Sequence, residues 1–174
     1  MKKLILMALL FPSFLFAQNT KQDSIWIPLK SFIGTWKGEG VGEPGNGKYE
    51  RSYQFILNKK FIEVKNKSIY PPSKDHPNGE VHEDVGYISY DKARKTFVLR
   101  QFHIEGFVNQ YKLESISQDG NTLVFVSEAI ENIPDGYRAR ETYQFGSEKE
   151  FTEVFELAEP GKGFELYSKV TLSR

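Results

Sequence analysis

Apolar and polar side chains alternate along most of the chain from about residue 35 onward. A two-residue period of this kind is typical of β-strands that bury one face and expose the other. Turn sequences rich in Gly, Asn, Asp and Pro interrupt the alternation, among them HPNG, IPDG and EPGKG. The pattern predicts about ten strands, at residues 35–42, 48–57, 60–70, 80–90, 95–104, 106–116, 121–131, 137–146, 150–158 and 163–172.

The number of predicted strands limits the architecture. An open sheet of ten short strands would leave two unpaired edges, and closure into a barrel removes both. We therefore predict an all-β fold, a ten-stranded antiparallel up-and-down β-barrel. A sandwich of two sheets is the structural alternative.

The segment WIPLKSFIG precedes the first predicted strand. It can form one or two helical turns, because Pro28 suits a first helical turn and Gly34 suits a helix stop. We expect residues 18–33 to form a lead-in with this short helix, and residues 34–174 to form the barrel domain.

The first residues have the features of a targeting segment. Lys2 and Lys3 precede the apolar run LILMALLFPSFLFA, which is too short for a stop-transfer helix. We interpret residues 1–17 as a signal peptide and expect export to a periplasm or secretion, with no membrane span after processing. A retained membrane anchor is the alternative.

Composition removes several classes of function. Lys+Arg and Asp+Glu both number 23 and no basic block occurs, which argues against nucleic acid as a partner. The chain contains no Cys, so disulfides and thiolate metal sites are excluded. The 14 Phe and 9 Tyr suit the half-buried surfaces of strands.

Three glycines share one face of the first predicted strand. Gly38, Gly40 and Gly42 lie at every second position after Trp36, so that face carries no side chain there. Either the strand bends sharply, or the backbone of the barrel wall closely approaches a ligand. We expect Trp36 to plug the barrel end above the short helix.

These residues resemble a known group of barrels. The sequence GTWK is similar to the first-strand signature of the calycins, the superfamily of lipocalins and fatty-acid-binding proteins, in which Gly-x-Trp opens the barrel. The longer string GTWKGEGVGEPGNGKYERSYQF resembles the nitrobindin branch, whose ten-stranded barrels begin with Gly-x-Trp-x-Gly-x-Gly-x-Gly. The resemblance implies a pocket inside the barrel. In that family it holds haem through a His in a closing strand that ends in Leu-x-Arg.

The closing strand of this chain departs from that pattern. FELYSKVTLSR keeps the Leu-x-Arg ending, but Tyr167 stands where the resemblance places the His. A Tyr phenolate can bind ferric haem, so Tyr167 is a candidate haem ligand. The alternation through Leu166, Ser168 and Val170 would turn Tyr167 outward unless a bulge intervenes.

Charged residues interrupt the predicted inner faces of four strands: Arg51, Arg100, Glu141 and Glu153. An unpaired buried charge is strongly destabilising, so each needs a partner or water. In one interpretation Arg51 and Arg100 receive the carboxylate of a ligand while aromatic side chains surround its apolar body. In the other, the two arginines pair with the two glutamates and no ligand is involved.

We expect a ligand-binding interior built from the residues Arg51, Tyr53, Arg100, His103, Tyr111, Glu141, Tyr143 and Glu153. His82 is expected at a solvated strand position. Neither histidine has a defensible second metal ligand, and no metal site is predicted.

No catalytic motif is present in the sequence: the phosphate-loop, zincin and nucleophile-elbow patterns are all missing. We leave enzymatic activity open and favour binding. Three functions remain: an exported barrel that binds a small apolar or amphipathic ligand, for which we prefer one with an acidic group; a haem-binding nitrobindin-like protein acting on reactive nitrogen species; and a structural or interaction barrel with a filled core.

Overall fold

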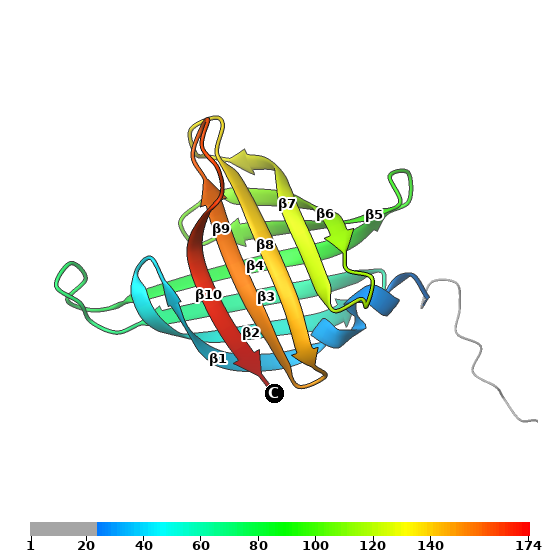
Figure 1. The fold of residues 1–174 in the computed structure, drawn as a ribbon, viewed down its shortest axis with the longest axis horizontal. Coiled ribbons are helices and arrows are strands. Elements are labelled where there is room, and N and C mark those ends of the chain that lie inside the picture. The colour runs from blue at the N-terminus through cyan, green and yellow to red at the C-terminus, as the bar shows by residue number, and fades with distance from the viewer. Residues whose placement is uncertain (1–23) are drawn as a thin grey trace, which may run out of the picture.

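The computed structural model describes residues 24–174, so the expected signal peptide lies outside the described residues. A 3-10 helix, η1 (Ile27–Phe32), leads into ten strands (Figure 1). In chain order these are β1 (Gly34–Gly42), β2 (Gly45–Ile56), β3 (Phe61–Tyr70), β4 (Glu80–Asp91), β5 (Thr96–His103), β6 (Val108–Ile116), β7 (Thr122–Glu131), β8 (Arg138–Ser147), β9 (Glu150–Ala158) and β10 (Glu165–Ser173).

The strands form one closed barrel. Each strand pairs in antiparallel fashion with the next one in the chain, and β1 pairs with β10 to complete the ring. This confirms the predicted ten-stranded barrel and excludes the sandwich. Within the part of the chain that the structure describes, no helix is long and apolar enough to cross a membrane.

The predicted turns are close to those observed, with one clear difference. We expected PGNG to separate the first two strands, but the turn consists of Glu43 and Pro44, and β2 already begins at Gly45. Gly45 has φ +110°, a backbone conformation that favours glycine.

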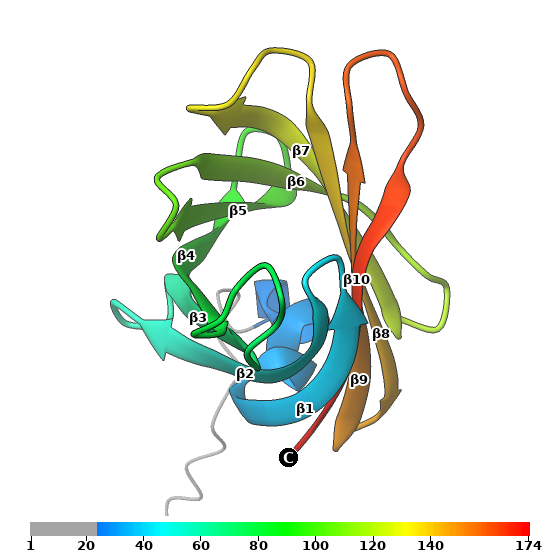
Figure 2. The same cartoon turned by 90° about the vertical axis from the view of Figure 1, so that its left-hand side faces the viewer.

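One end of the barrel is filled by the lead-in segment. Phe32 of η1 is buried, and its ring centroid lies 4.9 Å from those of Tyr53, Tyr143 and Phe145. In Figure 2 the helix lies at the far end of the barrel, behind the loops that face the viewer. The half of the interior around η1 is therefore a packed aromatic core.

The signature residues at the two chain ends meet at this plug. The indole Nε1 of Trp36 donates a 2.7 Å hydrogen bond to the carbonyl of Phe32. The guanidinium of Arg174 lies 4.4 Å from the Trp36 ring and donates to the carbonyl of Ile33 at 2.7 Å. Gly34 has φ +133°, which favours glycine where the chain turns from η1 into β1. The Gly-x-Trp and Leu-x-Arg patterns thus serve to close this end, as expected for Trp36.

The glycines of β1 are explained by the bend. A Cβ at Gly38 would collide with the carbonyl oxygen of Thr171, and a Cβ at Gly40 would lie 2.8 Å from the Cα of Val170. Both obstacles are backbone atoms of β10, so the strand bends closely over its neighbour. No ligand is needed to explain these positions.

We expect Gly38→Ala to lower the free energy of unfolding by about 1–3 kcal/mol, because the added methyl overpacks the contact between β1 and β10. The measurement is urea unfolding followed by tryptophan fluorescence. Gly146→Ala in β8 is the matched control, since its Cβ would meet only Glu150 Oε1 at 3.7 Å. Equal stability of the two variants would contradict this account of the bend.

Candidate functional site

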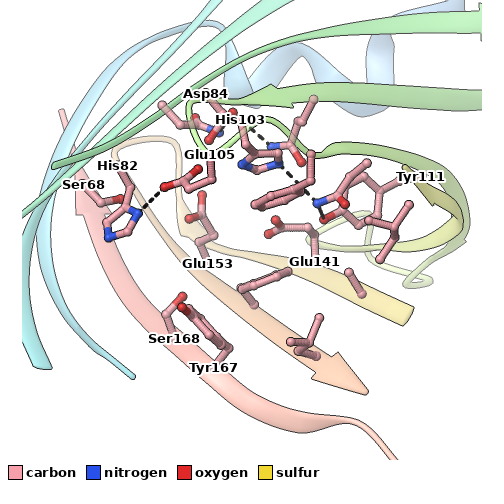
Figure 3. A pocket seen from close by; sticks show the side chains of 18 of the residues that line it. Ser68, His82, Asp84, His103, Glu105, Tyr111, Glu141, Glu153, Tyr167 and Ser168 are labelled. Atoms are coloured by element: carbon pink, nitrogen blue, oxygen red, sulfur yellow. Dashed lines mark hydrogen bonds and ion pairs between the residues drawn. The ribbon is translucent and has the colours of Figure 1, made fainter. Parts of the chain in front are cut away.

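The half of the barrel opposite the plug is hollow. A cavity of about 470 Å³ opens at this end and is lined by side chains from β2 to β10 (Figure 3). Its apolar side is formed by the residues Phe107, Ile130, Ile133, Pro134, Tyr137, Phe155 and Leu157. Its polar side is formed by charged and amide side chains of β2 to β6, β8 and β9.

Arg51 and Glu153 form a buried ion pair on the polar side. Arg51 donates to the Glu153 carboxylate from Nε at 3.1 Å and from Nη2 at 2.7 Å, and both side chains are 7% exposed. Nη1 donates to the carbonyls of Glu50 and Lys67 at 3.1 Å. Burial alone would lower the pKa of Arg51, but the charge of Glu153 raises it above its ordinary value. All three guanidinium nitrogens therefore have protein partners.

Glu141 lies next to this pair and has no partner. It is 8% exposed, and its side chain points into the cavity (Figure 3). Among the described residues its carboxyl group makes no hydrogen bond or ion pair. Burial raises the pKa of Glu141 well above its ordinary value, and the charge of Glu153 raises it further. The neutral acid is favoured here.

Asp84 provides a second carboxyl group with a perturbed pKa. It accepts a hydrogen bond from Asn66 Nδ2 at 2.9 Å and a long one from Gln101 Nε2 at 3.5 Å. Burial raises the pKa of Asp84 to about 7, although the nearby Arg51 lowers it. Near neutral pH this carboxyl group exchanges between its two protonation states.

His103 is a half-buried neutral imidazole. Its ring stacks on Phe107 with centroids 4.0 Å apart, and its Nε2 lies 3.2 Å from Asn109 Nδ2, which also donates to Tyr111 Oη at 2.8 Å. Burial lowers the pKa of His103 to about 4. The ring is therefore an uncharged part of the cavity wall at neutral pH.

His82 lies on β4 with 39% of its side chain exposed, and it also lines the cavity, which the prediction of a solvated strand position did not include. Its Nδ1 is 2.5 Å from Glu105 and its Nε2 is 2.8 Å from Glu80. The hairpin that carries Glu105 folds back over β4, where the amide of Ile104 donates to the carbonyl of Glu83. Alternation within one strand does not reveal such a contact between distant residues.

The predicted site residues fall into three groups: those that line the cavity, those in the packed core, and Arg100 on the outer face. Arg51, His103, Tyr111, Glu141 and Glu153 line the cavity together. Tyr53 and Tyr143 are also buried, but they belong to the packed core around Phe32 and not to the cavity lining.

The expected inward position of Arg100 is wrong. Arg100 is exposed on the outer face of β5, where its nearest polar partner is Ser89 Oγ at 3.5 Å. Phe97, Val98 and Leu99 are all buried in succession, so alternation does not decide which face of β5 is inside.

Sequence analysis missed several lining residues: Asn66, Asp84, Gln101 and Asn109. The alternation that places Arg51 inside β2 would also have placed Asp84 inside β4, in register with the inward Ile88. The two-residue period was therefore an available signal for Asp84.

Tyr167 reaches the cavity because of a bulge. The register between β10 and β9 shifts between Leu166 and Ser168, which turns Tyr167 inward. Its ring packs edge-on against Phe155 with centroids 5.3 Å apart. Burial raises the pKa of the phenol, and the charge of Glu43 raises it further.

A family model described as "THAP4-like, heme-binding beta-barrel domain" matches residues 26–174. The chain belongs to this heme-binding barrel family. No curated protein matches the chain.

Among solved structures, the barrel is similar to Rv2717c from M. tuberculosis, with 14% identity, a TM-score of 0.61, and coverage of 86% of this chain and 96% of that chain. A de novo designed fluorescence-activating β-barrel has 14% identity and a TM-score of 0.41 over 83% of this chain and 94% of its own. A redesigned barrel, mFAP0, bound to DFHBI, has 10% identity and a TM-score of 0.44 over 83% and 100%.

The closing strand of this family member lacks the haem-binding His that the resemblance implies. The closing strand offers the Tyr167 phenol, whose raised pKa disfavours the phenolate that binds ferric iron. Both ring nitrogens of His82 lie within hydrogen-bonding distance of carboxylates. His103 has its ring face against Phe107 and its Nε2 beside Asn109.

The charges of the cavity also do not fit haem. Haem carries two propionates, and the lining residues already include the carboxyl groups of Asp84, Glu141 and Glu153. Each guanidinium nitrogen of Arg51 already donates to Glu153 or to backbone carbonyls. This member of the heme-binding barrel family therefore has the family's fold with Tyr167 in place of the expected His and with an acidic cavity lining.

We expect Arg51→Met to lower the free energy of unfolding by about 3–5 kcal/mol, because it leaves Glu153 buried and unpaired. The double variant Arg51→Met/Glu153→Leu should recover most of the loss in urea unfolding. Lys37→Met, which breaks the exposed Lys37–Glu50 pair, is the control and should lose at most about 1 kcal/mol. A double variant as unstable as Arg51→Met would contradict the pairing argument.

We expect His82 and His103 to give opposite pH dependences of stability. Burial lowers the pKa of His82, but its hydrogen bonds to Glu105 and Glu80 outweigh this and leave the pKa above the ordinary 6.5. Its contribution is thus fully present below pH 6.5 and is lost as pH rises through the raised pKa. The lowered pKa of His103 instead removes stability as pH falls below 6.5.

The measurement is the melting temperature of the wild type, His82→Gln and His103→Gln between pH 5 and pH 8. The deficit of His82→Gln should shrink as pH rises, whereas the deficit of His103→Gln should shrink as pH falls. A deficit of His82→Gln that does not change with pH would show that the rim contacts do not depend on its charge.

Proposed function

We propose that this barrel binds a small amphipathic molecule in its open-ended cavity and does so without catalysing a reaction. The observation that carries the proposal is the division of the interior into a packed half and a hollow half. A structural barrel with a filled core describes only the half around Phe32. The hollow half has an apolar side and a polar side, which is the usual composition of a small-molecule site.

Family membership supports ligand binding but not the family's ligand. The chain retains the barrel of a heme-binding family, while Tyr167 replaces the His that the resemblance led us to look for. Haem is thus the competing ligand that any binding experiment has to include.

The preference for a ligand with an acidic group is not retained. It rested on Arg51 and Arg100 as receptors for a carboxylate. Arg100 lies on the outer face of the barrel, and Arg51 is paired with Glu153 and also donates to two backbone carbonyls.

We also propose that the protein acts after export, in a periplasm or outside the cell. Lys2, Lys3 and the following apolar run support this proposal. The mass of the chain recovered from the exported fraction tests it, and removal of residues 1–17 is the expected result.

We expect Ala139→Phe to abolish ligand binding, because Ala139 is fully buried in the cavity wall and a phenyl ring there occupies the hollow. Binding is measured by native mass spectrometry of the purified protein and by the fluorescence of an apolar dye. Gln144→Phe, on the exposed outer face of the same strand, is the matched control and should bind the dye like the wild type.

The same samples are titrated with haem and followed by absorption. We expect no stoichiometric Soret band. A band that appears in the wild type and is lost in Tyr167→Phe would overturn the proposal in favour of haem. A wild type that binds neither dye nor haem would support the structural barrel.

A further inference from the structure

The polar side of the cavity contains more negative than positive groups. Four acidic side chains line it: Asp84, Glu105, Glu141 and Glu153. The basic side chains in the lining that contact a carboxylate are Arg51 and His82. Arg51 is paired with Glu153, and His82 is paired with Glu105 and Glu80. Two carboxyl groups, those of Asp84 and Glu141, are left without a cation.

Both carboxyl groups line the same cavity, Asp84 from β4 and Glu141 from β8. The charges of Glu153 and Asp84 raise the pKa of Glu141, whereas the charge of Arg51 lowers it. Neither carboxyl group has all of its oxygens engaged: Asp84 accepts hydrogen bonds on Oδ1 alone, and Glu141 accepts none from the described residues. Hydrogen-bond acceptors are therefore available at the inner end of the cavity.

The neighbouring amides increase the excess of acceptors. The side-chain nitrogens of Asn66 and Gln101 both donate to Asp84, and that of Asn109 donates to Tyr111. The buried side-chain oxygens of the same three residues accept no hydrogen bond. Buried acceptors without donors are costly, and native proteins contain few of them. These three oxygens have almost no accessible surface, so the acceptors offered to a ligand come from the carboxyl groups that line the cavity, those of Glu141 and Asp84.

An anionic head group would not be complementary to this side of the cavity. A carboxylate or phosphate placed beside Glu141 would face the acidic groups of Glu153 and Asp84, and the nearby Arg51 is already paired with Glu153. An ammonium group carries three N–H donors and one positive charge, which is what the two carboxyl groups lack. The aromatic rings of Phe107 and Phe155 on the apolar side suit a hydrocarbon body.

We propose that the cavity selects amphipathic amines, with the ammonium group bound between Glu141 and Asp84 and the hydrocarbon body against the apolar side. The inference rests on the proposed function, because it names the head group of the ligand bound in that same cavity. Glu141 and Asp84 are binding residues in this arrangement.

Binding exchanges a proton for the ligand. In the free protein, burial holds Glu141 in its neutral form, and the arriving ammonium favours the carboxylate. The proton of Glu141, together with that of Asp84 in the molecules where Asp84 is protonated, leaves to solvent, so that carboxylates face the ammonium and the released protons balance the charge. The charged and titratable groups that face Glu141 are Arg51 on β2, Tyr53 on β2, Asp84 on β4, Tyr111 on β6, Tyr143 on β8 and Glu153 on β9. The tyrosines all have raised pKa values, so they stay neutral and are not the source of the proton.

The test compares octylamine, octanol and octanoate as probes of one chain length at pH 7, by isothermal titration calorimetry. Octylamine should bind at least about tenfold more tightly than octanol, because a hydrogen bond to a buried charged group adds to the same apolar contact. Octanoate should bind more weakly than octanol. Titration of octylamine in two buffers of different ionisation enthalpy should show proton release, and titration of octanol should show none.

Glu141→Gln and Asp84→Asn should each weaken octylamine binding about tenfold and leave octanol binding unchanged. Glu141→Gln replaces a neutral acid with a neutral amide of the same shape, so the fold should be preserved. Glu39→Gln, on the exposed outer face of β1, is the control and should bind all three probes like the wild type. The comparison of the three probes on the wild-type protein tests the inference even where a variant does not fold.

The outcomes separate the inference from the proposed function. Equal affinities for octanol and octylamine, or tighter binding of octanoate, would overturn the amine inference while the cavity remains a ligand site. Binding of octylamine without proton release, and unaffected by Glu141→Gln, would also overturn it. Failure of all three probes to bind would overturn the amine inference and count against the proposed function as well.

Discussion

The close approach of β1 to β10 is the constraint on which the rest of the molecule depends. Gly38 and Gly40 have no Cβ, so the first strand bends over the last and the sheet closes without an edge. Closure creates an interior, and Phe32 and Trp36 fill one half of it. The hollow at the other end follows from where this plug stops, because ten strands enclose more space than one short helix and its aromatic partners occupy.

The sequence allowed most of the fold to be predicted, because a two-residue period and explicit turns are local signals. Strand number, closure, the short helix and the role of Trp36 followed from them. The predictions failed where a second rule competes with alternation. Val98 is buried beside Leu99, so β5 could be read in two ways, and Arg100 was placed on the wrong face. A bulge before Ser168 turned Tyr167 inward, which a strict period does not predict.

The candidate site was harder to predict than the fold, because alternation gives the face of a strand but not the depth along it. Tyr53 and Arg51 share the inner face of β2, yet one packs on Phe32 while the other lines the cavity. Depth depends on how far the plug reaches, and this is a tertiary property. The pairing of Arg51 with Glu153 joins strands distant in sequence and decides that the arginine is not free for a ligand. Its consequence, an interior with unpaired acids, is visible only in three dimensions.

The two ends of the barrel have different roles. Arg174 and Trp36 meet at the plugged end, where they close the barrel and keep the family's sequence patterns whatever is bound elsewhere. The open end contains Tyr167 together with Glu141 and Asp84, and its chemistry differs from that of a haem site. The Gly-x-Trp and Leu-x-Arg patterns therefore lie at the end of the barrel that holds the fold together. Under the proposed function, the ligand is selected at the opposite end, where burial favours the neutral form of Glu141 and a positively charged ligand would favour its carboxylate.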